Sequence, residues 1–387
     1  ANYVFLNLCS VRQSAIDRVW GKINQIKKIN NKIKIILTGC ILPSEKNKFL
    51  KKVDYILDIK NLLEWSVLGK NKNKTDPSSS RVLGTPQDDI IKYIPIMTGC
   101  NNFCSYCAVP YTRGREKSRP VKDILDEVNK LVVQGYKFIT LLGQNVNSYN
   151  GKINFPELLK KINKIPGDYW LSFLTSHPKD MSDELIKCFK TCEHLIPYLH
   201  LPIQSGSNKI LKAMNRKYTA EDYLKLVKKI QKINPAINLS TDIIAGFPGE
   251  TKKDFNETAK IMKQVKFDMA YIARYSPRPD TVAAKLKDNI FLDEKKKREK
   301  ILNNILKNTA LKKNKKMLNK NIQVLIEKKS GDYIYGLTKN FKHVRINLET
   351  RNQSREFGIE IRDLIGKFVK IKIIKANEWN LEGELIK

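Results

Sequence analysis

The chain has 387 residues, of which 41% are hydrophobic, a proportion typical of a folded globular protein rather than a disordered one. Its 72 basic and 39 acidic residues give a formal net charge of +33, which favours a polyanionic partner such as nucleic acid, although a Lys-rich and Asn-rich composition throughout explains part of the excess. No apolar run approaches the roughly 20 residues of a membrane span, and no charged-then-apolar leader is visible, so we expect neither a membrane anchor nor a signal peptide.

The first region, residues 1–70, is expected to be a small α/β unit with a parallel sheet. Its strand-like runs are YVFLNL, KIKIILTGC and VDYILD, and helical periodicity covers SAIDRVWGKINQIKKI and SEKNKFLKK between them. Residues 71–91 are polar and charged and contain Pro and Gly, so they are predicted to form an exposed linker.

The second region, residues 92–317, contains strand-like runs separated by helical stretches. The runs are IKYIPIM, KFITLLG, WLSFLTS, IPYLHLPI, NLSTDIIAG and FDMAYIARY. Six strands with five crossovers predict an α/β fold built on a partial (β/α)6 barrel. A Lys-rich helix over about residues 293–317 follows the sixth strand.

The last region, residues 318–387, changes in character. The short runs NIQVLIEKK, YIYGLTK, HVRINL, KFVKIKIIKA and LEGELIK read as strands with no convincing helix between them. This pattern predicts a small antiparallel β-barrel, a fold that often binds RNA.

Three cysteines lie close together in GCNNFCSYC, at Cys100, Cys104 and Cys107. The spacing lets one loop place three thiolates around an iron–sulfur cluster and leaves one iron of a four-iron cluster open. A structural zinc site is the alternative, but no fourth Cys or His follows up to residue 135. The loop follows a predicted barrel strand, where barrel enzymes keep their active sites. The total of seven cysteines, odd and clustered, favours a reducing, cytoplasmic compartment.

Several stretches together resemble the radical S-adenosylmethionine methylthiotransferases. They are GCNNFCSYCAVPYTRGREKSRP, LLGQNVNSY, TSHPKDMSDELI, HLPIQSGSNKILKAMNRKYT and STDIIAGFPGET, with NLCSVRQSA and LTGC in the first region. The resemblance covers essentially the whole chain and is closest to the branch of tRNA 2-methylthio-N(6)-dimethylallyladenosine synthases (MiaB type). The last 70 or so residues resemble a TRAM domain, which binds RNA.

The resemblance implies a tRNA-modifying enzyme with two 4Fe-4S clusters and S-adenosylmethionine as cofactors. Cys100, Cys104 and Cys107 would hold the cluster that binds S-adenosylmethionine, whose reductive cleavage gives a deoxyadenosyl radical. The radical would take the hydrogen from carbon 2 of N(6)-isopentenyladenosine, the nucleoside 3′ to the anticodon, and a second S-adenosylmethionine would supply the methyl of the methylthio group. The protein contributes placement and electrostatics.

The auxiliary cluster of this family is held by three cysteines, and this sequence matches two of them. Cys9 and Cys40 match the second and third, while the first, expected about 30 or more residues before the second, is absent. We expect the sequence to lack the start of its first domain. The alternative is a chain that never had this ligand and carries a degraded cluster or none.

The remaining candidates for cofactor binding lie at predicted strand ends, where neutral amides and backbone groups can reach a ligand. They are Tyr106, Gly143, Gln144, Gln204, Ser205 and Gly246. His177 is as consistent with a structural role as with positioning of the cofactor, and we expect His200 to be a hydrogen-bonded core residue. Cys188 and Cys192, four apart on a predicted helix, are expected to be buried thiols.

The expected partner is the anticodon stem-loop of tRNA. Candidate RNA contacts are basic residues beside the cysteines and a mixed basic and aromatic set in the last region: Arg113, Arg115, Lys117, Arg119, Lys339, Phe341 and Arg345. A solvated charged loop is the alternative for the first set. We further expect a monomer, and a flavodoxin or ferredoxin as reductant. Two other functions stay open: the same chemistry on threonylcarbamoyl-adenosine in tRNA or on a ribosomal protein, and a tRNA-binding protein with a vestigial cluster.

Overall fold

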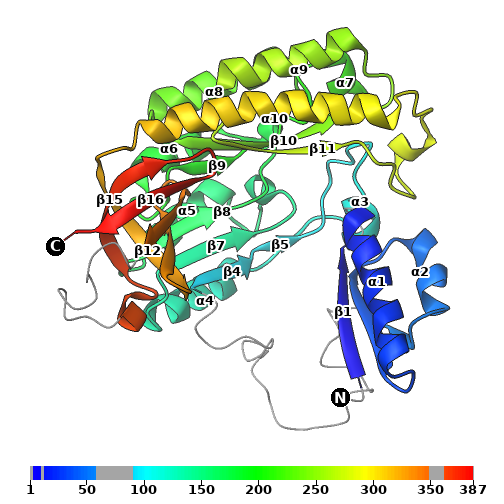
Figure 1. The fold of residues 1–387 in the computed structure, drawn as a ribbon, viewed down its shortest axis with the longest axis horizontal. Coiled ribbons are helices and arrows are strands. Elements are labelled where there is room, and N and C mark those ends of the chain that lie inside the picture. The colour runs from blue at the N-terminus through cyan, green and yellow to red at the C-terminus, as the bar shows by residue number, and fades with distance from the viewer. Residues whose placement is uncertain (1–2, 10–12, 58–89, 348–360, 387) are drawn as a thin grey trace. The chain divides into compact units, whose positions relative to one another are not determined.

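The computed structural model describes residues 3–9, 13–57, 90–347 and 361–386, which fall into two compact units (Figure 1). The first unit contains the described part of 1–83 together with 99–116 and 276–287. The second contains the described part of 84–98, 117–275 and 288–387. The predicted linker, residues 71–91, lies outside the described residues except for its last two positions.

The first unit is the parallel α/β structure that the sequence predicts. Its strands β1 (Tyr3–Cys9), β2 (Lys34–Cys40) and β3 (Tyr55–Ile56) form a parallel sheet in that order, joined by α1 (Gln13–Ile29) and α2 (Pro43–Leu50). Alternate apolar residues of the strands pack with Ile16, Ile23 and Phe49 of the helices in one small core. The unit also contains the short helix α3 (Val109–Arg113) and a 3-10 turn, Val282–Lys285.

The second unit confirms the six parallel strands of the predicted partial barrel. One sheet has the order β4 (Ile91–Pro95), β7 (Phe138–Leu142) and β8 (Trp170–Phe173), and the other has β9 (Tyr198–His200), β10 (Asn238–Ala245) and β11 (Met269–Arg274). A parallel bridge between Leu171 and Leu195 joins the two sheets. A short antiparallel pair, β5 (Met97–Thr98) with β6 (Lys117–Ser118), extends the end of β4.

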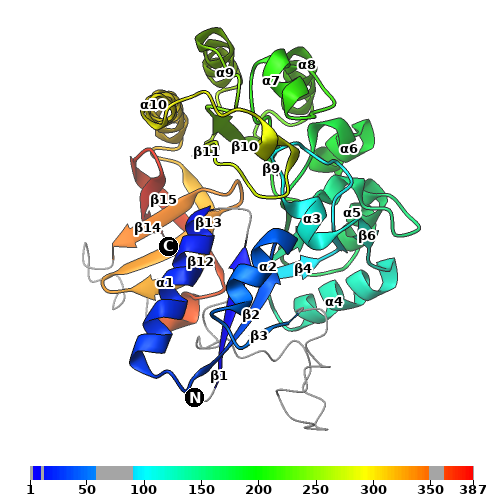
Figure 2. The ribbon, with the colours of Figure 1, turned by 90° about the vertical axis from the view of Figure 1, so that its right-hand side faces the viewer.

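Helices cover one face of these sheets. They are α4 (Val121–Val133), α5 (Phe155–Asn163), α6 (Asp183–Thr191), α8 (Ala220–Ile233), α9 (Lys252–Val265) and α10 (Leu292–Lys315), with the shorter α7 (Asn208–Ala213) between α6 and α8. Neighbours along this row contact one another, and Figure 2 shows α7, α8, α9 and α10 outside the strands. Alternate strand residues such as Ile139, Leu171, Leu199 and Ile243 join the main core beneath the helices. The other residues of each strand, which alternate with these, therefore lie on an inner face.

The last region forms a closed five-stranded barrel, as predicted, with one difference in strand direction. Its strands are β12 (Asn321–Ser330), β13 (Tyr333–Thr338), β14 (His343–Asn347), β15 (Phe368–Ala376) and β16 (Asn380–Leu385), in the order β12-β13-β14-β16-β15. The pair β14 and β16 is parallel, which corrects the expectation of a fully antiparallel barrel. A closed ring with an odd number of strands cannot alternate direction throughout, so one parallel pair is required.

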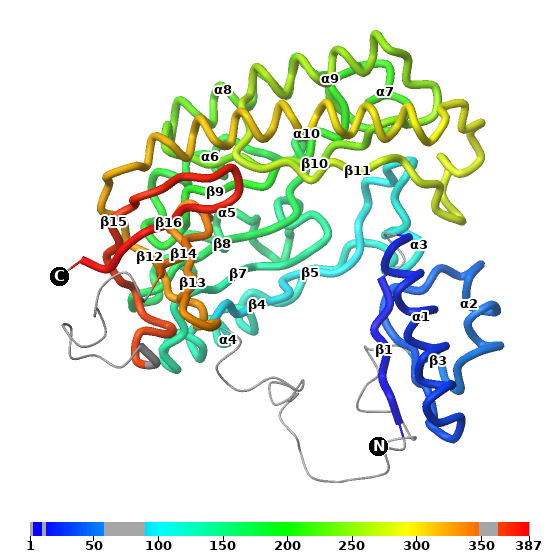
Figure 3. The backbone as a smooth tube through the Cα atoms, in the orientation of Figure 1, coloured from blue at the N-terminus to red at the C-terminus, as the bar shows by residue number. Residues whose placement is uncertain are grey.

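The terminal barrel packs against the amino ends of the inner strands within the second unit. Phe138, Trp170 and Tyr198, each at the start of its strand, form one apolar cluster with Leu325 and Leu337 of the terminal barrel. Buried Asp268 pairs with Lys342 at 3.1 Å and with Lys313 at 2.6 Å, which adds a charged contact to this junction. In Figure 3 the terminal barrel, in orange and red, follows α10 along the chain. Within the described part of the chain, no helix is long and apolar enough to cross a membrane.

Candidate active site

The three clustered cysteines lie in the first unit, in a loop between β5 and α3. Cys100 and Cys104 are each 8% exposed, and Cys107 is half-buried. The backbone N–H of Cys100 donates to the carbonyl of Gly114 at 3.1 Å, and that of Cys107 donates to the carbonyl of Cys104 at 3.0 Å. These bonds close the loop on itself, so the three thiols are carried by one short, internally tied segment.

Two glycines make this closure possible. Gly99 and Gly114 have φ values of 79° and 74°, a region that residues with a side chain rarely adopt. A Cβ at position 99 would also lie 2.0 Å from the carbonyl oxygen of Arg115, inside any allowed contact. The close approach of the two loop strands therefore depends on glycine at this point, immediately before the first cysteine.

The donor set of this loop fits an iron–sulfur cluster. Thiolates are the ligands that such clusters select, and all seven cysteines of the chain are free. Burial raises the pKa of the Cys100 thiol, so the loop gives this thiol little stabilisation as an anion unless a cation binds it. The amide Nδ2 of Asn102 lies 3.5 Å from the sulfur of Cys100 and can donate to it. No three His, Cys, Asp or Glu side chains in the described ranges are arranged to hold a single metal ion.

Cys9 and Cys40 are brought together by the parallel sheet of the first unit. They are the last residues of β1 and β2 and are paired in register, so both lie at the carboxyl edge of the sheet. Cys9 is exposed and Cys40 is 6% exposed. The preceding residue, Gly39, has φ of 103°, and a Cβ there would meet the side chain of Asn7 at 2.3 Å. Two thiols separated by 31 residues in sequence thus become neighbours at one edge.

Arg113, predicted to contact RNA phosphate, lies against one of these thiols. Its Nε donates to the sulfur of Cys40 at 3.0 Å. Arg113 is the last residue of α3, directly before Gly114. The neighbouring Arg115 lies over the ring of Phe103, 4.3 Å from the ring centre. Three residues of the predicted basic strip are exposed: Arg113, Arg115 and Lys117. Arg119, in the second unit, donates to the carbonyl of Pro95 at 2.6 Å and pairs with Glu127 at 2.8 Å, so its guanidinium already has protein partners.

In the second unit, the motif after β7 is fixed by buried amides. Gly143 is required because a Cβ there would lie 2.5 Å from Met97 Cγ. Gln144 is half-buried, whereas Asn145 and Asn147 are buried. Asn147 exchanges two hydrogen bonds with the backbone of His177, at 2.9 and 3.0 Å, and Asn145 Nδ2 donates to Asp180 at 2.7 Å. Asn147 was not predicted, because nothing in the motif indicated that its side chain would bind the backbone of His177 beyond the end of β8.

His177 has the structural role that was one of its two predicted roles. It is 5% exposed, and its Nδ1 accepts the backbone N–H of Lys179 at 3.2 Å. Burial, with Arg216 and Lys179 nearby, lowers the pKa of His177 to about 2. The ring is therefore neutral at physiological pH and acts as the cap of a 3-10 turn, Pro178–Asp180.

All three predicted residues after β9 and β10 are buried. Gln204 has φ of 72° and is 7% exposed, and its backbone pairs with β10 next to Asp242. Ser205 is fully buried, and its hydroxyl bonds to Thr258 of α9 at 3.3 Å; its expected contact with a cofactor is therefore corrected to a packing role. Gly246 has φ of 74°, and a Cβ there would strike Lys295 at 2.4 Å, so the closest group around it is protein.

Glu250, which follows that turn, does not cap the next helix. Thr251 is the N-cap of α9 and forms a capping box with Asp254. Glu250 instead accepts the Gly246 N–H at 2.7 Å and pairs with Arg298 at 2.6 Å, with both side chains buried. The pair ties α10 to the turn after β10. Cys188 and Cys192 are buried in the main core, as the sequence predicts.

Two of the three RNA candidates in the terminal barrel are used at its junction with the inner strands. The ring of Phe341 stacks on Tyr198 with centroids 4.5 Å apart, and Lys339 Nζ donates to the carbonyl of Glu193 at 3.2 Å. One face of the Phe341 ring is therefore covered by Tyr198, and its expected stacking on a base stays a prediction. Arg345 lies on the outer side of the barrel, 4.8 Å from the ring centre of Tyr333, and pairs with Glu382 at 2.9 Å.

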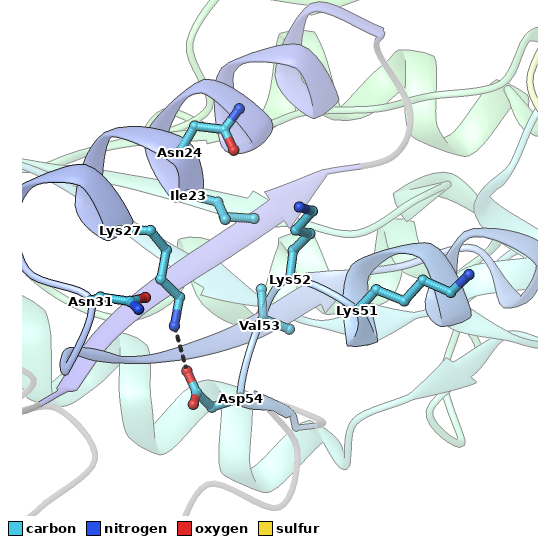
Figure 4. Close-up of a pocket in the computed structure, with 8 residues that line it drawn as sticks. All are labelled: Ile23, Asn24, Lys27, Asn31, Lys51, Lys52, Val53 and Asp54. Atoms are coloured by element: carbon cyan, nitrogen blue, oxygen red, sulfur yellow. Dashed lines mark hydrogen bonds and ion pairs between the residues drawn. The ribbon is translucent and has the colours of Figure 1, made fainter.

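A separate hollow of about 410 Å³ lies in the first unit, between the end of α1 and the turn before β3 (Figure 4). Lys27, Lys51, Lys52 and Asp54 supply its charges. Asp54 pairs with Lys27 at 3.4 Å and accepts the backbone N–H of Ile35 at 2.8 Å. It therefore serves to fix the amino end of β2, at the edge of the sheet opposite to Cys9 and Cys40.

Two protein-family models match this chain. A model described as the Radical SAM superfamily matches residues 94–262, which contain the three-cysteine loop. A model described as Uncharacterized protein family UPF0004 matches residues 1–58, which contain Cys9 and Cys40. The two matches cover most of the residues from which the candidate site is built.

Relatives match along the whole chain. A tRNA-2-methylthio-N(6)-dimethylallyladenosine synthase from Clostridium novyi (strain NT) is 43% identical, over 100% of this chain and 88% of that protein. One from Endomicrobium trichonymphae is 39% identical, over 100% of this chain and 91% of that protein. Among solved structures, the radical S-adenosylmethionine methyltransferase TsrM from Kitasatospora setae has a TM-score of 0.54 and 15% identity, over 70% of this chain and 61% of that chain. The last comparison shows a shared fold.

Proposed function

We propose that this chain, which belongs to the family of tRNA-2-methylthio-N(6)-dimethylallyladenosine synthases, transfers a methylthio group to carbon 2 of N(6)-isopentenyladenosine in tRNA. The observation that carries the proposal is the internally tied loop of Cys100, Cys104 and Cys107, whose donors suit a 4Fe-4S cluster. The loop lies in a chain whose whole length aligns with 88% of one such enzyme.

In this proposal the three thiols of the loop hold the cluster to which S-adenosylmethionine binds. When bound, that cluster and S-adenosylmethionine supply the one-electron chemistry that activates an unreactive C–H bond. The chain's own contribution is geometric. Gly99 and Gly114 let the loop close, the backbone bond from Cys100 to Gly114 fixes the first thiol, and Asn102 can donate to its sulfur.

Cys9 and Cys40 are proposed to ligate the auxiliary 4Fe-4S cluster associated with the sulfur that is transferred. Their in-register position at the carboxyl edge of β1 and β2 supports this, because it places two thiolates side by side on a rigid sheet. The Nε–H of Arg113 adds a donor toward Cys40. Hydrogen bonds to ligand sulfurs are one of the ways in which proteins set the reduction potential of a cluster.

The anticodon stem-loop of tRNA is the proposed substrate, which fits a net charge of +33. Four of the predicted RNA contacts are exposed: Arg113, Arg115, Lys117 and Lys339. Arg345 is half-buried and lies over the ring of Tyr333 in β13. We further propose cofactor contacts from Tyr106, Gln144 and Gln204, a small flavoprotein or ferredoxin as reductant, a monomeric state and a reducing cytoplasmic setting, which suits seven free cysteines.

The test is anaerobic reconstitution with iron and sulfide, followed by incubation with reductant, S-adenosylmethionine and tRNA that carries isopentenyladenosine. Nucleoside mass spectrometry is expected to show the methylthio product. Iron analysis is expected to show an amount of bound cluster that falls when ligand cysteines are removed. Loss of threonylcarbamoyl-adenosine instead would assign the same chemistry to another nucleoside. A protein that binds tRNA but takes up no iron with its cysteines intact would be a binding protein rather than an enzyme.

A further inference from the structure

A chain of polar side chains in contact with one another lies on the inner face of the second unit. Tyr198 OH lies 2.7 Å from Ser240 Oγ, Ser240 Oγ lies 2.8 Å from His200 Nδ1, and His200 Nε2 lies 3.4 Å from Asp242 Oδ2. These residues come from β9 and β10, which pair with Ser240 opposite His200. The chain therefore runs across two adjacent strands and ends at one carboxylate, Asp242.

The inner placement follows from the alternation of β10. Leu239, Ile243 and Ala245 belong to the core beneath the helices, so Ser240 and Asp242 lie on the opposite face. The amino end of that face is closed by the terminal barrel, which packs on Tyr198. The side chain of Asp242 remains 37% exposed, whereas that of His200 is 12% exposed. The accessible end of the chain is thus the carboxylate.

The direction of the hydrogen bonds follows from what each group can do. An ionised carboxylate only accepts, so Nε2 of His200 is the N–H side of its 3.4 Å contact with Asp242. Nδ1 of a neutral imidazole must then accept, which makes Ser240 its donor and Tyr198 the donor to Ser240. Burial raises the pKa of Tyr198 far above its ordinary value, which keeps this hydroxyl protonated. Asp242 Oδ2 lies beside His200 Nε2, and Asp242 Oδ1 takes no part in this contact.

We infer that Asp242 accepts a hydrogen bond from the exocyclic N–H of the substrate adenine, with His200 as its positioning residue. This inference rests on the proposed function. A carboxylate on an inner face repels phosphate and accepts N–H or O–H donors, so it suits a base edge rather than a backbone. Adenine presents an N–H at carbon 6, whereas guanine presents an acceptor oxygen there. Isopentenyladenosine retains one such hydrogen, so this contact would select adenine over guanine.

Such a contact also fits the way in which enzymes reach a base. A base that is the target of chemistry is taken out of its stack and read by hydrogen bonds to its edge inside a pocket. Tyr271 lies beside the polar chain, with its ring 5.8 Å from that of His200, and is 45% exposed. An exposed aromatic next to an oriented acceptor offers an apolar surface and one directional hydrogen bond, which together define a purine site.

The experiment compares two anticodon stem-loop RNAs on the reconstituted full chain. One carries N(6)-isopentenyladenosine, and the other carries the matched ether in which oxygen replaces the N–H. Because a hydrogen bond to a charged acceptor is lost, wild type should bind the ether roughly 10- to 100-fold more weakly. Asp242→Asn should discriminate by less than about 3-fold, since an amide can donate to the ether oxygen. The Kd for S-adenosylmethionine should stay unchanged in the variant, which also reports that the site is folded.

Matched variants separate the contact from general effects. Asp183→Asn removes a carboxylate from an ion pair with Lys229 on the outer helices and should keep the wild-type discrimination. His200→Gln has an amide that can donate to Asp242, so it should retain more of the discrimination between the two RNAs than His200→Ala. The difference between these two variants should lie mainly in the KM for RNA rather than in kcat.

Two results would overturn the inference. The first is equal affinity of wild type for the two RNAs. The second is weaker S-adenosylmethionine binding by Asp242→Asn with RNA discrimination intact, which would place the carboxylate at the cofactor's adenine. Because both arms measure binding, a failure of methylthio transfer would count against the proposed function without being confused with either result.

Discussion

Replacing Phe341 by Ala separates the two roles that an aromatic residue of the terminal barrel can have. The ring stacks on Tyr198 at 4.5 Å and meets Phe138 edge-on at 6.0 Å. Partial burial of a Phe side chain contributes about 1.5–2 kcal/mol, and each aromatic pair adds about 0.5–1.5 kcal/mol beyond burial. Phe341→Ala should therefore destabilise the junction between the terminal barrel and the inner strands by about 3 kcal/mol.

Native-state hydrogen exchange is the suitable assay because the two barrels can open separately, so a single unfolding transition is not assured. Amides of β13 and of the start of β7 should exchange faster in the variant by about 100-fold under conditions where opening is at equilibrium. Trp379→Ala is the matched control, since this aromatic of the same barrel is 44% exposed, and it should leave those rates nearly unchanged. If Phe341→Ala left the exchange rates unchanged but weakened RNA binding, the ring would be a base-stacking residue and the packing argument would be refuted.

Three further outcomes follow from buried groups. Cys104→Ala should abolish cleavage of S-adenosylmethionine and lower the iron content after reconstitution. Cys188→Ala, in the main core, should change neither quantity. Equal behaviour of the two variants would show that the division into cluster ligands and core thiols is wrong. Since the pKa of His177 falls from its ordinary value of 6.5 to about 2, the unfolded chain gains a proton below pH 6.5 that the folded chain does not. Stability should thus fall as the pH falls, by about 2 kcal/mol more between pH 6.5 and 5 than in His177→Asn, as measured by urea unfolding at each pH. Glu250→Gln should lower the free energy of unfolding by about 3 kcal/mol, because buried Arg298 loses a charge partner at 2.6 Å; a change below about 0.5 kcal/mol in urea unfolding would contradict this.

The fold was predictable from the sequence because its signals are local. Alternation of strand-like and helical runs predicted the six parallel strands, and the loss of helical runs after residue 317 predicted the terminal barrel. The parallel pair β14 and β16 was missed, since strand direction in a closed ring depends on the number of strands and on which two close it. No single strand-like run of the sequence indicates either the number of strands or which two of them close the ring.

The candidate site was predictable only in part, and the reason is again physical. Cys100, Cys104 and Cys107 are close in sequence, so spacing alone indicated a shared ligand. Ser205 and Phe341 looked available because they stand in polar or basic stretches, but Thr258 and Tyr198, which occupy them, come from distant elements. Burial against a residue that is distant in sequence cannot be predicted from the neighbouring residues alone.

Arg113 shows how such a remote contact can change the interpretation of a motif. Beside three cysteines, its charge suggested a phosphate contact, yet its Nε donates to the sulfur of Cys40 at 3.0 Å. The next residue, Gly114, accepts the backbone N–H of Cys100 at 3.1 Å. Two consecutive residues therefore connect a thiol of each proposed cluster, one through its side chain and the other through its backbone. A hydrogen bond to a ligand sulfur affects a cluster's potential, and a backbone bond fixes the position of a ligand. Residues 113 and 114 thus each contact one of the two cysteine sites, while contact of the exposed Arg113 with RNA stays a prediction.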